Sequence, residues 1–403
     1  MNFLRGFSLN TASVYLVYAL GLANAVLLAN VLGPEAYGSL KWWTPVVVLG
    51  GRFLGEWLNK GNTYMVGRER ARDAALTVTL VYCLGLGALL LLSAGWGHGL
   101  AESFREDISL ALCLLAAGLI TFTVLEMGCL AILLGEDRLK LYALIPVAFI
   151  SCYLGGSLLL WHLDRLTLEA AMAVWLGAVG VAALAALVAL FGRGARLSWG
   201  GRALFRRMLR VGGRGAVTMA ALMLMWKGDV FLVERFLGTA AVGVYGVAVG
   251  LAEMIQRVPN VASAVLFSRV VRSQDSPRLF LWVALGMLGF AVLGAAGLLL
   301  IGERLLAVVF PEYTDAYEPL VWLLPGMLFS GLGAVFQAKL FGEGYPPVTM
   351  WAPAAAVVVD IGLNLWLIPS LGLRGAAISA SVAYAVWGLT ITTYYLRRNR
   401  AGW

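Results

Sequence analysis

The sequence contains little charge, histidine or cysteine for its length. Of its 403 residues, 13% are charged, two are histidine and four are cysteine. His98 and His162 have no cysteine, aspartate or second histidine at the spacing of a zinc site or a catalytic triad. The four cysteines lie inside apolar stretches and are expected to pack as reduced thiols. No Gly-rich phosphate loop precedes a Lys-Ser or Lys-Thr pair. We therefore expect no metal, no cofactor and no enzymatic activity.

Apolar residues make up 61% of the chain, and the mean hydropathy is +0.85. A soluble core of this size needs far less apolar material, and the apolar stretches lack the alternation of membrane β-strands. Each stretch is long enough to cross a bilayer as a helix. The sequence therefore predicts an all-α integral membrane protein with twelve transmembrane helices, near residues 10–31, 39–59, 74–96, 109–134, 141–162, 168–191, 213–236, 242–268, 279–302, 318–338, 346–369 and 375–396.

Lysine and arginine alternate in density between the connections of these twelve segments. The termini and the connections on their side of the membrane contain 21 basic residues, whereas the other connections contain five, namely Lys41, Arg105, Arg165, Arg304 and Arg374. Cytoplasmic connections are the basic ones in membrane proteins. This bias predicts a multi-pass protein of the cytoplasmic (inner) membrane with both termini in the cytoplasm. Because the basic residues are dispersed, the net charge of +8 does not indicate nucleic-acid binding.

The longest basic connection divides the chain into two halves of six helices. We predict an N-terminal bundle over 1–191, a basic cytoplasmic linker over 192–212 and a C-terminal bundle over 213–403. Within the linker, Leu204, Phe205, Met208 and Leu209 share one helical face opposite arginines. This amphipathic segment is expected to lie on the membrane lipids of the inner leaflet. In the eighth segment, Pro259 is the expected position of a helix break.

The two halves show a repeated hairpin sequence. Leu32-Gly33 is followed by Tyr37-Gly38, and Leu237-Gly238 is followed by Tyr245-Gly246. Glycine lets the chain reverse between helices, and each tyrosine is expected to anchor its ring at headgroup level. Because each half has six segments and starts on the same side, the sequence predicts two parallel repeats.

Four blocks together resemble one known family. They are Leu32-Gly33-Pro34-Glu35-Ala36-Tyr37-Gly38, Leu237-Gly238 through Val242-Gly243-Val244-Tyr245, Phe310 through Leu320, and Asn364 through Ile378. In content and order they resemble the polysaccharide-transport family, which contains flippases of O-antigen and exopolysaccharide units. This family belongs to the multidrug/oligosaccharidyl-lipid/polysaccharide exporter superfamily.

The resemblance implies two bundles around a central cavity that opens alternately to the two sides of the membrane. It implies an alternating-access flippase, which moves isoprenoid-diphosphate-linked oligosaccharide units from the inner to the outer face for surface polysaccharide or lipopolysaccharide biosynthesis. A polysaccharide polymerase is an expected partner. In this fold the first and second spans face the seventh and eighth. The resemblance thus places Arg52, Lys227 and Arg257 around one substrate-binding site.

Ionisable side chains inside the predicted spans are the candidates for transport, because charge in hydrocarbon is costly. Arginine binds phosphate through two parallel hydrogen bonds, and lysine acts as a point charge. The pairs Arg52–Glu56 and Glu253–Arg257 are four residues apart and share a helix face, whereas Lys227 and Asp229 must find partners elsewhere. The carboxylates are candidates for coupling to H⁺ or Na⁺: Glu56, Glu126, Asp229, Glu253 and Asp360.

One alternative function stays open. The candidate carboxylates outnumber the candidate cations, which also suits a cation-coupled antiporter of drugs or other small molecules from the same superfamily. The sequence does not identify the sugar unit, the coupling ion, the oligomeric state or the type of cell envelope. It also does not separate structural ion pairs from functional ones.

Overall fold

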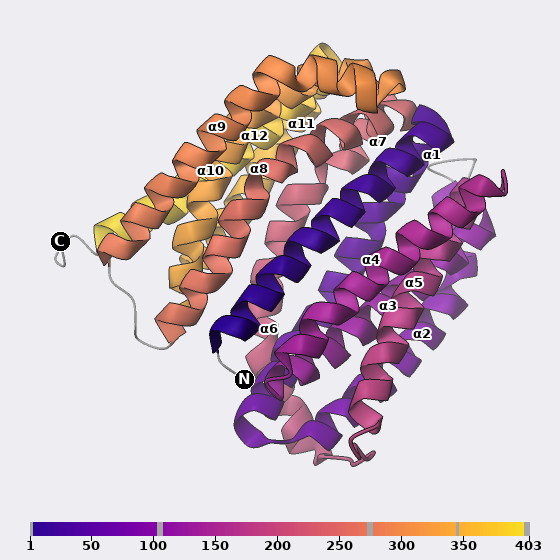
Figure 1. Cartoon of the computed structure of the whole chain (residues 1–403), viewed down its shortest axis with the longest axis vertical. Helices are drawn as coiled ribbons and strands as arrows, with labels where there is room; N and C mark the ends of the chain where they lie inside the picture. The colour runs from indigo at the N-terminus through magenta and orange to yellow at the C-terminus, as the bar shows by residue number, and fades with distance from the viewer. Residues whose placement is uncertain (1–2, 103–107, 272–276, 344–345, 399–403) are drawn as a thin grey trace. The chain divides into compact units, whose positions relative to one another are not determined.

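The structure is a computed structural model that describes residues 3–102, 108–271, 277–343 and 346–398. These ranges form helices and contain no strand (Figure 1). The predicted all-α class is confirmed. Arg105 and Arg272, which the sequence places in connections, lie outside the described residues. The helices are α1 (Phe3–Glu69), α2 (Arg72–Glu102), α3 (Leu110–Gly135), α4 (Leu139–His162), α5 (Leu168–Phe191), α6 (Gly201–Lys227), α7 (Asp229–Leu237), α8 (Thr239–Val271), α9 (Pro277–Val309), η1 (Pro311–Ala316), α10 (Tyr317–Gly342), α11 (Val348–Leu371) and α12 (Leu373–Arg398).

Helix α1 contains the first two predicted spans. The described residues include 11 helical stretches that are long and apolar enough to cross a membrane, and the first, Ala12–Glu69, has 58 residues. At a rise of 1.5 Å per residue it would be about 87 Å long, roughly three times the hydrocarbon thickness. Gly33 breaks it, with φ 72° and ψ 172°. The two arms of α1 and the other ten stretches together correspond to the twelve predicted spans.

Gly33 and Gly238, the two glycines that the sequence pairs as hairpin positions, have the same backbone conformation. Gly238, between α7 and α8, has φ 84° and ψ 177°. This region of φ/ψ space is essentially restricted to glycine. Both Leu-Gly pairs therefore change the chain direction by the same local geometry.

The chain folds into two compact units. The first comprises Met1–Leu32 and Trp43–Met219, and the second comprises Gly33–Trp42 and Ala220–Trp403. In the first unit, α3 packs on α2 and α5, and α4 packs on α5. In the second unit, α10 packs on α8, α9 and α12, and α12 also packs on α11. A short piece of α1 thus belongs to the core of the second unit.

That piece of α1 explains the first family block. Tyr37 is 2% exposed and meets the ring of Tyr313 in η1 at 5.8 Å, edge to face. The backbones of α1 and α8 touch where Gly38 faces Gly243, because a Cβ on Gly38 would lie 1.9 Å from the Thr239 carbonyl oxygen. The predicted headgroup anchoring of Tyr37 is therefore wrong: its ring is buried by protein instead.

The amphipathic segment of the linker packs on protein rather than on lipid alone. It is the first part of α6, which continues to Lys227 as one helix. Met208 is 0% exposed in a cluster with Trp57 of α1, and the ring of Phe205 meets that of Trp57 at 5.8 Å. The expectation of an apolar face resting on membrane lipid is wrong for these two residues. Hydrophobic periodicity does not distinguish a lipid from a protein partner.

Helix α8 passes through Pro259 without the predicted break. A proline removes one backbone hydrogen bond and usually kinks a helix. Here Pro259 is buried against Gly331 of α10. The Ser263 hydroxyl also donates to the Pro259 carbonyl oxygen at 2.7 Å. The helix thus continues through a buried proline.

Candidate functional site

A helix break separates the two charged residues of the seventh predicted span. Helix α6 ends at Lys227, α7 begins at Asp229, and Gly228 lies between them. Lys227 Nζ donates to Glu253 Oε1 at 2.6 Å, whereas Asp229 Oδ2 accepts from the Tyr245 hydroxyl at 2.5 Å. Both partners lie on α8, and Lys227 and Asp229 do not pair with each other, as their two-residue spacing predicts. The break therefore assigns these neighbouring charges to two different clusters.

The first cluster brings three basic side chains close to one carboxylate. Glu253 pairs with Lys227 and, at 3.2 Å, with Arg257. Lys41 of α1 interacts electrostatically with Glu253 and Arg257, and its ammonium lies 5.1 Å from the centre of the Tyr37 ring. Three cations thus gather around the carboxylate of Glu253. We call Lys41, Lys227, Arg257 and Glu253 the cationic cluster.

Lys41 is the cation of this cluster that the sequence did not indicate as a candidate. The sequence counts it with a connection between two spans, and the structure places it in α1, eight residues after the break at Gly33, in the segment that belongs to the second unit. Gly246 of α8 makes room for it, since a Cβ there would lie 2.8 Å from Lys41 Cγ. A lysine at the edge of an apolar segment does not reveal this location.

The second cluster consists of buried oxygen atoms from three helices. Asp229 and Tyr245 are 2% and 0% exposed, and Asp360 and Asn364 of α11 are 2% and 0% exposed. Helix α11 packs on α7, and Asp229 and Asp360 are close enough to interact electrostatically. Asp360 and Asn364 lie close enough to interact through their side chains, but Asp360 Oδ1 and the Asn364 side-chain amide make no hydrogen bond of standard geometry with the described residues. We call these four residues the oxygen cluster.

Unpaired buried polar atoms are costly, so the oxygen cluster has the chemistry to take up a ligand. Carboxylate, amide and hydroxyl oxygens are the ligands that hard cations prefer, and a buried carboxylate also binds a proton. Sequence reasoning identified Asp229 and Asp360 but not Tyr245 or Asn364. Tyr245 was expected at headgroup level, and that expectation is wrong. Asn364 could have been found from its position one helical turn after Asp360.

The charge of Glu56 in the first unit is locally compensated. Glu56, whose side chain is 1% exposed, pairs with Arg52 at 2.8 Å and with Lys60 at 3.3 Å. Both predicted four-residue pairs, Arg52–Glu56 and Glu253–Arg257, are thus present. Glu126 is partly buried on α3 and forms no ion pair with the residues that the structure describes. The structure therefore places Arg52, Glu56 and Glu126 in the first unit, and Lys227, Asp229, Glu253, Arg257 and Asp360 in the second.

The sequence and the fold have known relatives. Residues 3–274 match the family described as "Polysaccharide biosynthesis protein". No curated protein sequence matches the chain. The lipid II flippase MurJ in its inward closed conformation has a similar structure, with a TM-score of 0.80 and 15% identity over 97% of this chain and 87% of MurJ.

Two transporters of the MOP superfamily are also similar in structure. One is a multidrug resistance MATE family transporter in an inward-facing conformation, with a TM-score of 0.78 and 16% identity over 98% of each chain. The other, from Pyrococcus furiosus, has a TM-score of 0.68 and 15% identity over 98% of this chain and 96% of its own. At these identities the similarity establishes the fold, which is that of multi-pass membrane transporters.

Proposed function

Because this chain belongs to the polysaccharide biosynthesis protein family, we propose that it is a flippase of isoprenoid-diphosphate-linked oligosaccharide units. It would move them from the inner to the outer face of the cytoplasmic membrane for surface polysaccharide biosynthesis, without an enzymatic reaction of its own. The single observation that carries this proposal is the cationic cluster. Its three basic side chains around one carboxylate provide the cationic contacts that a diphosphate joining a lipid to a sugar needs, since that diphosphate has one ionised oxygen on each phosphate.

Each residue of the cluster has a distinct role in this proposal. Lys227 and Lys41 provide point charges, whereas Arg257 can donate two parallel hydrogen bonds to a phosphate. Glu253 holds Lys227 and Arg257 in place while the site is empty. Arg52 has its charge balanced by Glu56 in the first unit. We propose Arg52 as an additional substrate contact, formed as the transporter changes conformation.

We propose that the oxygen cluster binds the coupling ion, H⁺ or Na⁺. Gly228 joins the two clusters, since Lys227 lies directly before it and Asp229 directly after it. A change in charge at Asp229 thus acts on α7 next to the residue that holds the diphosphate. Only the polar head of the substrate needs a pathway, because its lipid tail can remain in the bilayer. Membrane lipids therefore take part in the transport cycle.

The first test compares Lys227→Ala with Lys60→Ala in cells that depend on this protein for surface polysaccharide. Glu253 keeps Arg257 and Lys41 when Lys227 is removed, so the fold should persist. Losing a charged contact to phosphate should weaken substrate binding by about 10- to 100-fold. We expect normal membrane abundance with little surface polymer, and partial recovery in Lys227→Arg. Lys60→Ala removes an equivalent partner of Glu56 and should leave export unchanged.

The double variant Glu253→Leu with Arg257→Leu tests whether Arg257 binds the substrate or only neutralises the charge of Glu253. If Arg257 only compensates Glu253, this matched pair should recover both abundance and export. If Arg257 binds substrate, abundance should recover without export. A fully active Lys227→Ala variant would contradict the diphosphate site.

A second candidate function is that of a cation-coupled antiporter of drugs or other small molecules, because one of the structural relatives is a multidrug resistance transporter. The buried carboxylates Asp229 and Asp360 favour it, because they can exchange a proton or Na⁺ for a cationic substrate. If the protein is an antiporter, deleting it should change drug tolerance and leave surface polysaccharide intact. If it is a flippase, deleting it should remove surface polysaccharide and leave drug tolerance unchanged.

A further inference from the structure

The start of α6 presents arginines that have no acidic neighbours in the sequence. Between Arg193 and Gly228 the chain contains no aspartate or glutamate. Arg202, Arg206 and Arg210 follow one another at four-residue intervals on one side of the helix and are all exposed. In the part of the chain that the structure describes, none of the three forms an ion pair.

Arg207 differs from these three and provides an internal comparison. Its Nη1 donates to Glu69 Oε1 at 2.7 Å. This hydrogen bond and the charge of Glu69 raise the pKa of Arg207. The guanidinium of Arg207 is therefore committed to a partner within the protein.

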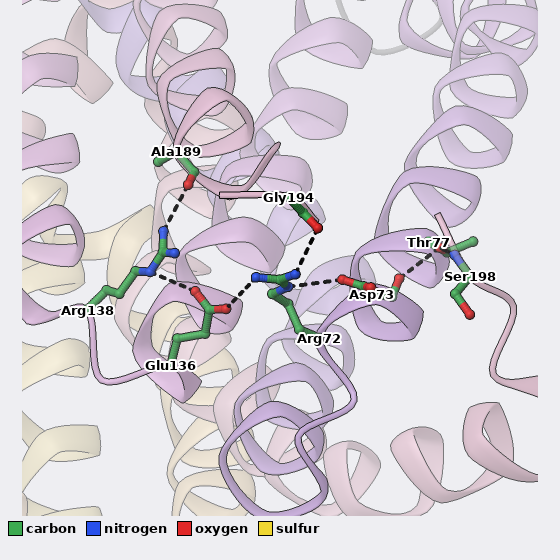
Figure 2. Close-up of polar contacts among 8 residues, drawn as sticks. All are labelled: Arg72, Asp73, Thr77, Glu136, Arg138, Ala189, Gly194 and Ser198. Carbon is green, nitrogen blue, oxygen red and sulfur yellow. Dashed lines mark hydrogen bonds and ion pairs between the residues drawn. The ribbon is translucent and has the colours of Figure 1, made fainter. Parts of the chain in front are cut away.

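Two large apolar side chains precede the arginines. Leu197 is 64% exposed and Trp199 is 61% exposed. Between them, the Ser198 backbone N–H donates to Thr77 Oγ1 at 2.8 Å (Figure 2). Because Ser198 is attached to α2, its two neighbours are held at the surface of the first unit and not inside it.

Further contacts fix the beginning of this segment. Arg72 Nη2 donates to the Gly194 carbonyl oxygen at 3.2 Å, and Arg138 Nη1 donates to the Ala189 carbonyl oxygen at 2.8 Å. Figure 2 shows the Glu136 carboxylate between the two guanidinium groups, which it binds at 3.4 Å and 2.8 Å. The end of α5 and the chain after it are thus fastened to α2 and to the turn after α3. These contacts hold the segment that contains Leu197 and Trp199 in place on the surface of the first unit.

Contacts to α1 and α2 put the arginines at headgroup level. Arg207 binds Glu69, the last residue of the stretch of α1 that is long and apolar enough to span the membrane. Ser198 binds Thr77, five residues after Arg72, where the corresponding stretch of α2 begins. Both Ser198 and Arg207 thus lie where these helices leave the hydrocarbon. Phosphate groups of lipids are therefore within reach of the exposed arginines.

We propose that Leu197, Trp199, Arg202, Arg206 and Arg210, which we call the α6 basic surface, form a binding site for anionic phospholipids. Trp199 and Leu197 enter the apolar edge of the interface, where tryptophan is favoured. The arginines donate paired hydrogen bonds to lipid phosphates. The exposed apolar pair next to the arginines favours a lipid over an acidic protein as the occupant. This site is independent of the proposed flippase activity.

The test measures which lipids the purified full-length protein retains from micelles containing equal amounts of phosphatidylglycerol and phosphatidylcholine, by native mass spectrometry. The triple variant Arg202→Gln, Arg206→Gln, Arg210→Gln should lower the preference for phosphatidylglycerol about tenfold or more. The control Arg165→Gln, Arg235→Gln, Arg304→Gln removes the same charge from three other exposed arginines and should keep the preference. All variants are compared as monodisperse protein with equal thermal stability.

Two single variants test the details. Arg207→Gln should keep the preference for phosphatidylglycerol, because Glu69 already occupies that guanidinium. Thr77→Val should reduce it about two- to threefold, because Ser198 loses its attachment while every arginine remains. The proposal is overturned if the α6 triple variant retains the wild-type preference, or if the control triple loses it equally. It is also overturned if the wild-type protein shows no preference, and an acidic protein partner would then be the better explanation.

Discussion

Asp360 and Asn364 of the second unit show how much a single buried polar atom can indicate. Each side chain is 2% exposed or less, and together they present buried atoms that make no hydrogen bond of standard geometry with the described residues. A native core rarely tolerates several such atoms at one place. By contrast, Asp229 has two partners, the Tyr245 hydroxyl and the Val230 backbone N–H. The incomplete hydrogen bonding thus lies on α11.

This difference leads to a prediction about ion coupling. Asp360→Asn keeps the shape of the side chain and removes its charge, and the new amide can still hydrogen-bond with the Asn364 side chain. Protein abundance should therefore stay normal. The dependence of transport on a Na⁺ or pH gradient, measured with reconstituted vesicles and lipid-linked oligosaccharide, should disappear. A Na⁺ gradient and a pH gradient are applied separately, so that the same vesicles identify the ion.

Glu126→Gln is the matched control for Asp360→Asn, because it neutralises a partly buried carboxylate of the first unit. We expect gradient dependence to persist in this variant. If Glu126→Gln abolishes the dependence and Asp360→Asn does not, the coupling site belongs to the first unit. The role of the oxygen cluster would then be structural.

At the scale of helices, the family blocks determine how segments turn and touch. Gly33 and Gly238 interrupt the helical backbone and change its direction at the ends of the first and seventh predicted spans. Gly38 and Gly243 allow the backbones of α1 and α8 to meet. These glycines therefore maintain the packing of the second unit, and they do not indicate which sugar is carried.

Replacing either hairpin glycine should reduce folding before it affects transport. Gly33→Val and Gly238→Val each force a branched side chain into a conformation that costs about 1–3 kcal/mol. We expect a lower yield of monodisperse protein and a lower melting temperature. Gly250→Val is the control: Gly250 lies in the middle of α8 with open space around its Cβ position, and this substitution should change the stability by about 0.5 kcal/mol or less. Normal stability of the hairpin variants combined with lost export would instead make these glycines functional contacts.

Features that depend on residues close together in the chain could be predicted from the sequence. The apolar segments, the hairpin glycines and the pairs Arg52–Glu56 and Glu253–Arg257 follow from local spacing, and the structure contains them. Contacts between distant segments could not be predicted. Lys41 comes within electrostatic range of Glu253, more than 200 residues later in the chain, only because α1 and α8 touch at two glycines.

What packs on an amphipathic helix face also could not be predicted from the sequence. Met208 and Phe205 have the periodicity of a membrane-surface helix, yet Trp57 of α1 covers them. The arginines on the same helix remain exposed, as the sequence pattern indicates. Amphipathicity therefore predicts that a face is covered, and the tertiary structure decides what covers it.

For the whole molecule, the decisive question is how often α1 crosses the membrane. If the break at Gly33 divides α1 into two spans, the chain crosses twelve times and both termini lie on the same side. If α1 crossed once, the count would be 11 and the termini would lie on opposite sides. The excess of basic residues on alternate connections favours twelve crossings, with the basic side in the cytoplasm.

Reporter fusions at the connections distinguish these two counts. We expect fusions after Arg70, Arg206, Arg272 and Arg398 to report the cytoplasm, and fusions after Glu102, Asp164 and Asp315 to report the outside. Arg70 lies in the turn between α1 and α2, and Asp315 lies in η1. A fusion directly after Met1 adds the discriminating comparison, because with twelve crossings it reports the same side as Arg70. Opposite sides for Met1 and Arg70 would mean that α1 crosses once. A cytoplasmic Asp315 would overturn the arrangement of the second half and, with it, the direction of transport proposed for the cationic cluster.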